Sequence, residues 1–234
     1  MKKKALLKDT LREIRKSFGR FFSIFAIVGI GVAFFAGVRD SVPVMKNTAD
    51  TYFDDYNFMD LKIMSTIGMT KEDVSAIRQV DGVAGVYGSY SMDVLNTHNN
   101  QQRVYKLLSY PMNAKAEDEN YINQMRLIKG RLPQKADECV IEYTNIKGAD
   151  SRIGETITFA SGTDEKLDAS LKRSTYKIVG EVTMPYYLSY EKGSSAIGSG
   201  SIDNYAVIPD TNFKSSYYTE VYVTVDGAKK PNSY

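Results

Sequence analysis

FFSIFAIVGIGVAFFAGV, residues 21–38, decides the fold, because eighteen consecutive positions carry no charge and eleven of them are Phe, Ile or Val. A helix of this length spans about 27 Å, slightly less than the ~30 Å hydrocarbon core of a bilayer. Arg20 and Arg39 flank the stretch, and long basic side chains can reach the headgroup layer. The stretch therefore predicts a transmembrane helix, with a short segment before it and most of the chain after it.

The charge is distributed unevenly about this helix. Residues 1–20 hold eight basic and two acidic side chains, a net charge of +6, whereas the whole chain carries +2 and the remainder therefore −4. Cytoplasmic flanks of membrane helices are enriched in Lys and Arg. We therefore expect a protein of the plasma membrane with a cytoplasmic N-terminus and an extracellular main domain. Because the flank explains the basic residues, we expect no nucleic acid partner.

The N-terminal segment has its own pattern. Apolar residues recur there at spacings of three and four, which predicts a basic amphipathic helix lying on the cytoplasmic membrane surface; they are Leu6, Leu7, Leu11, Ile14 and Phe18. Two alternatives remain open. The periodicity can be incidental to a stop-transfer flank, and residues 1–40 can be a cleaved signal peptide. The apolar run is longer than the usual ~7–15 residues of a signal peptide, and Phe34 occupies a position where cleavage after Ala36 needs a small residue.

The outer part reads as an α+β domain dominated by strands, preceded by a helical connector at 39–58. Thr70 and Asp73 resemble a capping box, so we expect a short helix ending near Gly82. Alternation and β-branched residues predict strands, and the strands so predicted lie at 59–65, 83–96, 103–110, 138–143, 153–161, 175–184, 204–209 and 219–227. Residues 96–102 and 161–174 are expected hairpin loops, 111–129 is poorly periodic, and the Gly/Ser-rich stretch 187–204 is an expected mobile loop.

The residues that most often form catalytic or metal sites do not cluster in recognisable motifs in this sequence. Cys139 is the single cysteine and lies in an apolar run, which favours a buried packing residue. His98 is the single histidine and lies in a polar loop. Lys192 precedes the glycines of KGSSAIGSGS, the reverse of the order in a phosphate-binding loop. We therefore expect no catalytic, cofactor or metal site, and a chain that is not itself an enzyme; a membrane-anchored hydrolase is disfavoured for the same reason.

A row of small residues marks one face of the predicted membrane helix. Gly29, Ala33 and Gly37 are spaced four apart, and Ala26 and Ala36 lie beside them. Small residues at this spacing allow a second helix to approach closely. Gly and Ala are also common in membrane helices that make no such contact. We interpret the row as a helix-packing face, which implies partner helices outside this chain.

Several stretches together resemble the N-terminal part of an FtsX-like/MacB-like ABC transporter permease, over essentially the whole chain. The first is LREIRKSFGRFFSIFAIVGIGVAFFAGV, and the second is MTKEDVSAIRQVDGVAGVYG. The third, KGRLPQKADECVIEYTNIKGADSRIGETITF, is similar to a signature of the family. The residues that match this signature are Gly130, Arg131, Pro133, Glu138, Ile141, Ile153, Gly154 and Ile157. The stretch from Tyr176 to Asp203 looks like the long Gram-positive branch.

The resemblance implies a permease subunit whose extracytoplasmic domain is of the MacB-like periplasmic core type. It implies a cytoplasmic ABC-type ATPase as partner, with the remaining permease spans or a second permease copy, in a lipid bilayer. Movement would pass from the ATPase to the outer domain, for export or mechanotransmission involving a lipid, lipoprotein or antimicrobial peptide. The predicted parts are 1–20 (amphipathic helix), 21–38 (membrane helix), 39–58 (connector), 59–228 (core domain) and 229–234 (start of a truncated continuation). The alternative is a single-span anchored module that binds a ligand or protein.

Overall fold

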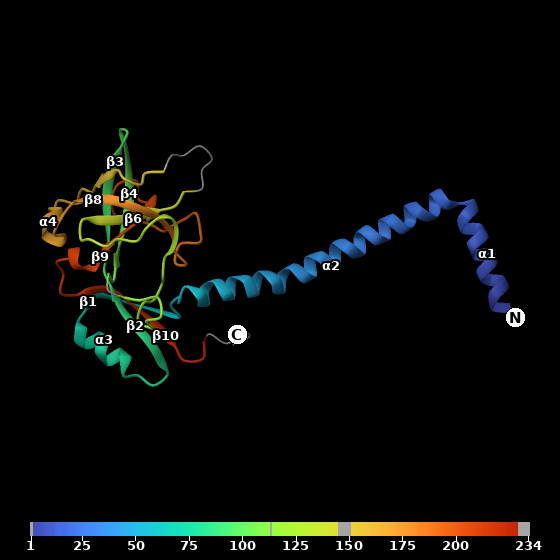
Figure 1. The fold of residues 1–234 in the computed structure, drawn as a ribbon, viewed down its shortest axis with the longest axis horizontal. Helices are drawn as coiled ribbons and strands as arrows, with labels where there is room; N and C mark the ends of the chain where they lie inside the picture. The colour runs from blue at the N-terminus through green and yellow to red at the C-terminus, as the bar shows by residue number, and fades with distance from the viewer. Residues whose placement is uncertain (1, 113, 145–150, 229–234) are drawn as a thin grey trace. The chain divides into compact units, whose positions relative to one another are not determined.

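The computed structural model describes residues 2–112, 114–144 and 151–228, and for residues 2–4 the backbone alone. The expected continuation at 229–234 lies outside the described residues. Two compact units divide the chain at Thr51 and Tyr52. The first holds α1 (Lys2–Lys16) and most of α2 (Phe18–Asp55), which meet at Ser17. The second unit is the mixed, strand-rich domain that the sequence predicts (Figure 1).

The apolar stretch forms part of one long helix rather than a separate span. α2 runs without interruption through residues 21–38 and through the expected connector as far as Asp55, with Pro43 in its interior. It has no buried residue, and Phe34 and Ile27 are 74% and 71% exposed. A helix that is apolar all round must be covered by protein or by lipid. α2 is long and apolar enough to cross a membrane, and no protein covers it within the described residues.

Two sheets build the second unit. The small sheet has the antiparallel order β1 (Leu61–Met69), β10 (Tyr218–Val225), β2 (Val83–Ser89). Helix α3 (Lys71–Arg78) packs on it through Val74 and Ile77. The predicted capping box is present, because the Thr70 hydroxyl accepts from the Asp73 N–H and the Asp73 carboxylate accepts from the Thr70 N–H. The strand–helix–strand prediction for this region is confirmed.

The large sheet has seven strands. Six follow the order β3 (Ser91–His98), β4 (Gln101–Tyr110), β9 (Asn204–Pro209), β6 (Glu138–Glu142), β8 (Thr175–Thr183), β5 (Arg126–Gly130), and β7 (Thr156–Thr158) also pairs with β8. Its β4–β9 and β6–β8 pairs are parallel. Leu107 and Leu108 belong to different buried clusters, so both faces of this sheet are covered. Two short helices, α4 (Leu167–Ser170) and η1 (Asp210–Asn212), complete the unit.

Several sequence predictions are wrong in detail. The single strand expected at 83–96 is two strands, because β2 pairs with β10 and β3 pairs with β4 on either side of Tyr90. Alternation continues through Tyr90, so the pattern does not reveal the change of sheet. The strand β5 lies in a region that reads as poorly periodic. The loop expected at 96–102 is a tight turn at Asn99 and Asn100, both with positive φ, as a two-residue hairpin requires.

The Gly/Ser-rich stretch is packed rather than free. Ile197 and Ile202 are 8% and 7% exposed and form a small apolar cluster with Val104. Ser194 and Ser201 form a bridge, and the Ser195 hydroxyl donates to Asp93 Oδ2 at 2.6 Å. Two isoleucines among many glycines and serines are enough to anchor the segment, which composition alone does not predict.

Candidate functional site

The predicted helix-packing face lies uncovered within its unit. Gly29, Ala33 and Gly37 fall on α2, and a β-carbon built on either glycine would meet no atom within 4 Å. The face is therefore free to receive a second helix, although packing against one stays a prediction.

The signature residues come together around β8. Arg131 donates two hydrogen bonds to Glu138, Nη1 to Oε2 at 2.7 Å and Nη2 to Oε1 at 2.5 Å. Glu138 is 5% exposed and also accepts the backbone N–H groups of Gln134 and Lys135. These bonds, the Arg131 pair above all, lower the pKa of the Glu138 carboxyl to about 2. The segment 130–138, which includes Pro133, is thus closed into a loop by one buried carboxylate.

The two signature glycines lie against the same strand. Gly130 has φ +76, and a β-carbon there would collide with the carbonyl oxygen of Val179. The N–H of Arg131 donates to that same oxygen at 3.0 Å, and the N–H of Gly154 donates to Ile178 O at 2.8 Å. These contacts explain the signature as a structural brace of the β5–β6 connection. Chemistry at these residues is not indicated.

The residues that follow the long helix are bonded into the second unit. The chain leaves α2 through Asn57, which has φ +47 and is 6% exposed. Its Nδ2 donates to Tyr121 O at 3.0 Å and to Glu119 O at 3.1 Å. Its own carbonyl accepts the N–H of Asn123 at 2.8 Å. We call these contacts, with those of Asn123, the asparagine clasp.

Asn123 completes the clasp from the segment before β5. It also has a positive φ, +58, and is 4% exposed. Its Oδ1 accepts the N–H of Met59 at 3.1 Å, and the next residue, Gln124, donates its N–H to Tyr56 O at 2.8 Å. Residues 56–59 are thereby bonded to 119–124 by backbone and side chain together, within the second unit.

The first strand after the clasp is tied to both sheets. Lys62 on β1 forms an ion pair with Glu220 on β10 (Nζ to Oε1, 2.9 Å) and donates to the Tyr186 hydroxyl at 2.6 Å. Tyr186 belongs to the segment that follows β8. The Tyr222 hydroxyl donates to Glu220 Oε2 at 2.6 Å. Lys62 thus connects β1 to β10 of its own sheet and to Tyr186 in the segment that follows β8.

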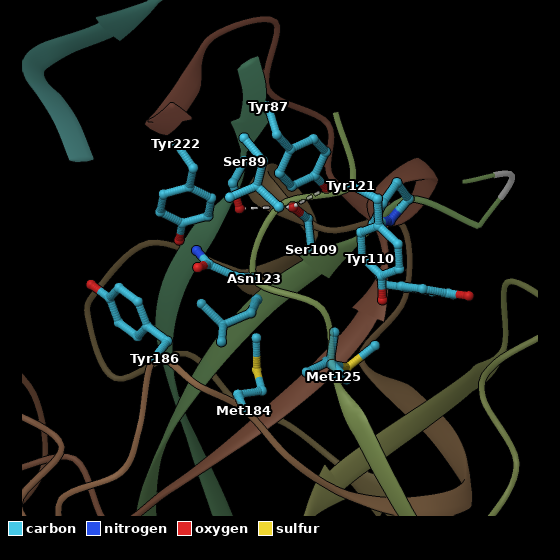
Figure 2. A pocket seen from close by; sticks show the side chains of 14 residues that line it. Tyr87, Ser89, Ser109, Tyr110, Tyr121, Asn123, Met125, Met184, Tyr186 and Tyr222 are labelled. Carbon is cyan, nitrogen blue, oxygen red and sulfur yellow. Dashed lines mark hydrogen bonds between the residues drawn. The ribbon is translucent and has the colours of Figure 1, made fainter. Parts of the chain in front are cut away.

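A cavity of about 20 Å³ lies beside the clasp, between the two sheets. Figure 2 shows Tyr186 and Tyr222 on one side of it and Tyr110 and Tyr121 on the other, with Asn123 between. Ser109 on β4 is hydrogen-bonded to Tyr87 and Ser89 on β2, at 3.2 and 3.1 Å. Asn123 thus lines the contact surface of the sheets as well as holding the helix end.

Other candidate residues lie apart. Cys139 is fully buried in the large-sheet core, and burial raises the pKa of its thiol to about 12. His98 is exposed at the tip of the β3–β4 hairpin. No signal in the sequence singled out Asn57 and Asn123. The one sequence feature that could have indicated their role is that Asn tolerates positive φ and that Asn57 follows a helix end.

Comparison with known proteins places these features in context. The family model described as the MacB-like periplasmic core domain matches residues 21–233. The extracellular domain of the ABC-type transporter YknZ from Gram-positive bacteria is similar, with 14% identity, a TM-score of 0.43, and coverage of 70% of this chain and 76% of that one. The periplasmic region of MacB from Actinobacillus actinomycetemcomitans has 12% identity, a TM-score of 0.39, and coverage of 73% and 69%. A search of curated proteins found no match.

Proposed function

The chain belongs to the MacB-like periplasmic core domain family, and on that premise we propose that it couples ATP hydrolysis by a cytoplasmic partner ATPase to movement of its outer domain. It carries the periplasmic-type domain of an ABC transporter permease together with an apolar helix suited to a membrane. In this proposal the chain is no enzyme itself, and the partner supplies hydrolysis. The moved or sensed substrate is a lipid, lipoprotein or antimicrobial peptide.

The asparagine clasp is the observation that carries the proposal. A helix that only anchors the outer domain in the membrane could be connected to that domain by a flexible linker. Here the residues that follow the helix are bonded to the domain: the carbonyl of Asn57 accepts the N–H of Asn123, and the Asn123 Oδ1 accepts the N–H of Met59. Coupling between distant sites requires an element that both sites bias. In this proposal α2, a single helix of 38 residues that ends at Asp55, is that element.

In this proposal α1 and the face of small residues on α2 receive the movement from the ATPase. The +6 charge of residues 1–20 favours a cytoplasmic position for α1, where an ATPase could contact it. Gly29, Ala33 and Gly37 would pack against the remaining permease spans or a second copy of the permease. Closure of the ATPase would shift these helices against each other and move the outer domain.

Two experiments test the proposal. In intact cells, a thiol reagent that does not cross membranes should modify a cysteine at position 164 and leave one at position 8 untouched; the reverse pattern would overturn the orientation. The ATPase should copurify with the complete permease and be lost when residues 1–20 are deleted. Retention of the ATPase without these residues would contradict the proposed role of α1 in contacting the ATPase.

A further inference from the structure

A second, larger cleft lies at one end of the large sheet. It has a volume of about 560 Å³ and opens where β6 and β8 end, beside the first residues of β9. Its lining includes Glu142 at the end of β6 with Tyr143 after it, Asn204 from β9, and Tyr187, Tyr190 and Lys192 from the segment after β8. Pockets that hold small molecules have volumes of about 300–1,000 Å³. The cleft is therefore large enough for a ligand of two or three sugar units.

The charged groups of the cleft balance each other. Lys192 is 8% exposed, an unusual burial for a lysine, and its Nζ lies 3.1 Å from Glu142 Oε1, whose side chain is 17% exposed. Arg103 and Asp203 add one charge of each sign. A buried charge is costly unless it is paired. The lining thus offers a fixed polar network without net charge, which favours an uncharged ligand.

One polar atom in this network lacks a partner among the described residues. Asn204 donates its Nδ2 to Glu142 Oε2 at 3.2 Å, and because a carboxylate accepts, this bond fixes the orientation of the amide. The Asn204 Oδ1 is buried and has no hydrogen bond within the described chain. A buried acceptor without a donor is destabilising. A ligand that reaches Asn204 would offer this oxygen an O–H or N–H group, and the Lys192 ammonium, which pairs with Glu142, can also donate to a ligand oxygen; a sugar hydroxyl is both donor and acceptor.

Tyrosine rings supply the rest of the recognition surface. Tyr187 stacks on Tyr205 with ring centroids 5.0 Å apart and an angle of 16°, and Tyr190 at the mouth is 90% exposed. Flat aromatic rings that carry a polar tip pack against the C–H face of a pyranose and still hydrogen-bond its rim. Leu188 is the sole aliphatic residue among the described lining residues, so the cleft offers little to apolar side chains of a peptide.

The sheet also disfavours an extended peptide at this place. Peptides that add to a sheet need an unpaired strand edge. The strands β4, β6, β8 and β9 each have neighbours on both sides. A peptide could therefore gain no ladder of backbone hydrogen bonds from them.

We propose that this cleft, lined by Tyr187, Tyr190, Lys192 and Asn204, binds an uncharged oligosaccharide. The sugar ring lies against the tyrosines, and its hydroxyl groups donate to Asn204 Oδ1 and accept from Lys192. This site is independent of the coupling proposed above, because binding in the cleft requires neither the ATPase nor movement of the helix.

The test is binding to the full chain in nanodiscs, with chitotriose, cellotriose and maltotriose as probes and trialanine as the peptide comparison. The chain has no Trp and 17 Tyr, so tyrosine fluorescence reports a titration, and saturation-transfer NMR shows which ligand protons face the rings. At least one trisaccharide should bind saturably. Tyr190→Ala and Asn204→Leu should each weaken binding about tenfold or more, equal to about 1.4 kcal/mol per tenfold.

Tyr217→Ala is the matched control, since Tyr217 is also exposed, at 54%, and does not line the cleft. It should leave the affinity unchanged. Absence of saturable binding by all three trisaccharides would overturn the proposal. Equal effects of Tyr190→Ala and Tyr217→Ala would overturn it as well, and so would binding of trialanine in place of the sugars.

Discussion

Asn57, which follows the end of α2, and Asn123, which precedes β5, are joined by one backbone hydrogen bond, and the side chain of each holds other backbone groups of the same unit. The carbonyl of Asn57 accepts the N–H of Asn123 at 2.8 Å, and Asn123 Oδ1 accepts the N–H of Met59 at 3.1 Å. Both residues adopt positive φ and both are buried. Asparagine suits this role because it tolerates positive φ and carries a donor and an acceptor.

Replacement of Asn57 by Ala should destabilise the outer domain by about 3–4 kcal/mol. The carbonyls of Glu119 and Tyr121 lose their donor, at about 1 kcal/mol each, and alanine at positive φ adds about 1–2 kcal/mol. Urea denaturation of the chain in detergent, followed by tyrosine fluorescence, measures the loss. Asn99→Ala is the matched control, because Asn99 has φ +49 and is exposed in the hairpin turn; it should lose only the backbone contribution of about 1–2 kcal/mol. Equal losses would show that the buried hydrogen bonds of Asn57 contribute nothing.

Gly130→Ala should destabilise the fold more than Gly154→Ala, although both glycines have positive φ. The conformational strain of about 1–2 kcal/mol is common to both. At position 130 the new methyl group also collides with Val179 O, whereas nothing lies within 4 Å at position 154. The midpoint of thermal unfolding should fall further for Gly130→Ala. A smaller fall in this midpoint than for Gly154→Ala would mean that the backbone of the β5–β6 connection shifts to accommodate the methyl group, and would contradict the prediction.

The Arg131–Glu138 pair should make stability depend on pH at the acid end. The pKa of Glu138 falls to about 2 in the folded chain, mainly through Arg131, from about 4.5. The folded state therefore binds fewer protons than the unfolded state in this range. The stabilisation is complete above about pH 5 and is lost as the pH falls toward 2.

Arg131→Met isolates this contribution. It leaves a buried carboxylate without its cation and should lower the free energy of unfolding at pH 7, by less than for a fully buried pair because the side chain of Arg131 is 44% exposed. The variant should also lose less stability than the wild type between pH 5 and 3. Parallel pH profiles for the two proteins would contradict the assignment.

The helix-packing face predicts a functional defect without loss of folding. Leu at positions 29, 33 and 37 would block a close helix contact, so ATP hydrolysis by the partner should proceed while the outer domain stops responding. Ile24, Val28 and Phe35 lie on the opposite face of α2, and their replacement by Leu is the matched control, expected to leave coupling intact. Unchanged coupling in the triple Leu variant at 29, 33 and 37 would refute the packing face.

The apolar helix, the capping box of α3 and most strands follow from the sequence because each depends on local periodicity or local hydrogen bonding. The division of residues 83–96 between two sheets does not, since alternation looks the same on either side of Tyr90. The burial of Ile197 and Ile202 is likewise set by partners distant in sequence.

The sites divide in the same way. The signature residues Arg131 and Glu138 could be named from sequence, but their bidentate contact needed the turn between them. The clasp could not be predicted, because Asn57 and Asn123 are 66 positions apart and each looks like an ordinary loop asparagine. The cleft at Lys192 could not be predicted either, because the composition of the stretch around Lys192 suggests a mobile loop.

The most direct test of the coupling is a distance measured across the clasp. Spin labels at positions 46 and 164, one on α2 and one in the outer domain, report the placement of helix and domain, and buried Cys139 should not react with the label. In the complete permease with its ATPase in nanodiscs, ATP with vanadate should shift the distance distribution. The Asn57→Ala variant should broaden the distribution and remove the shift. An identical distribution with and without nucleotide in the wild type would contradict the central claim that the helix moves the outer domain.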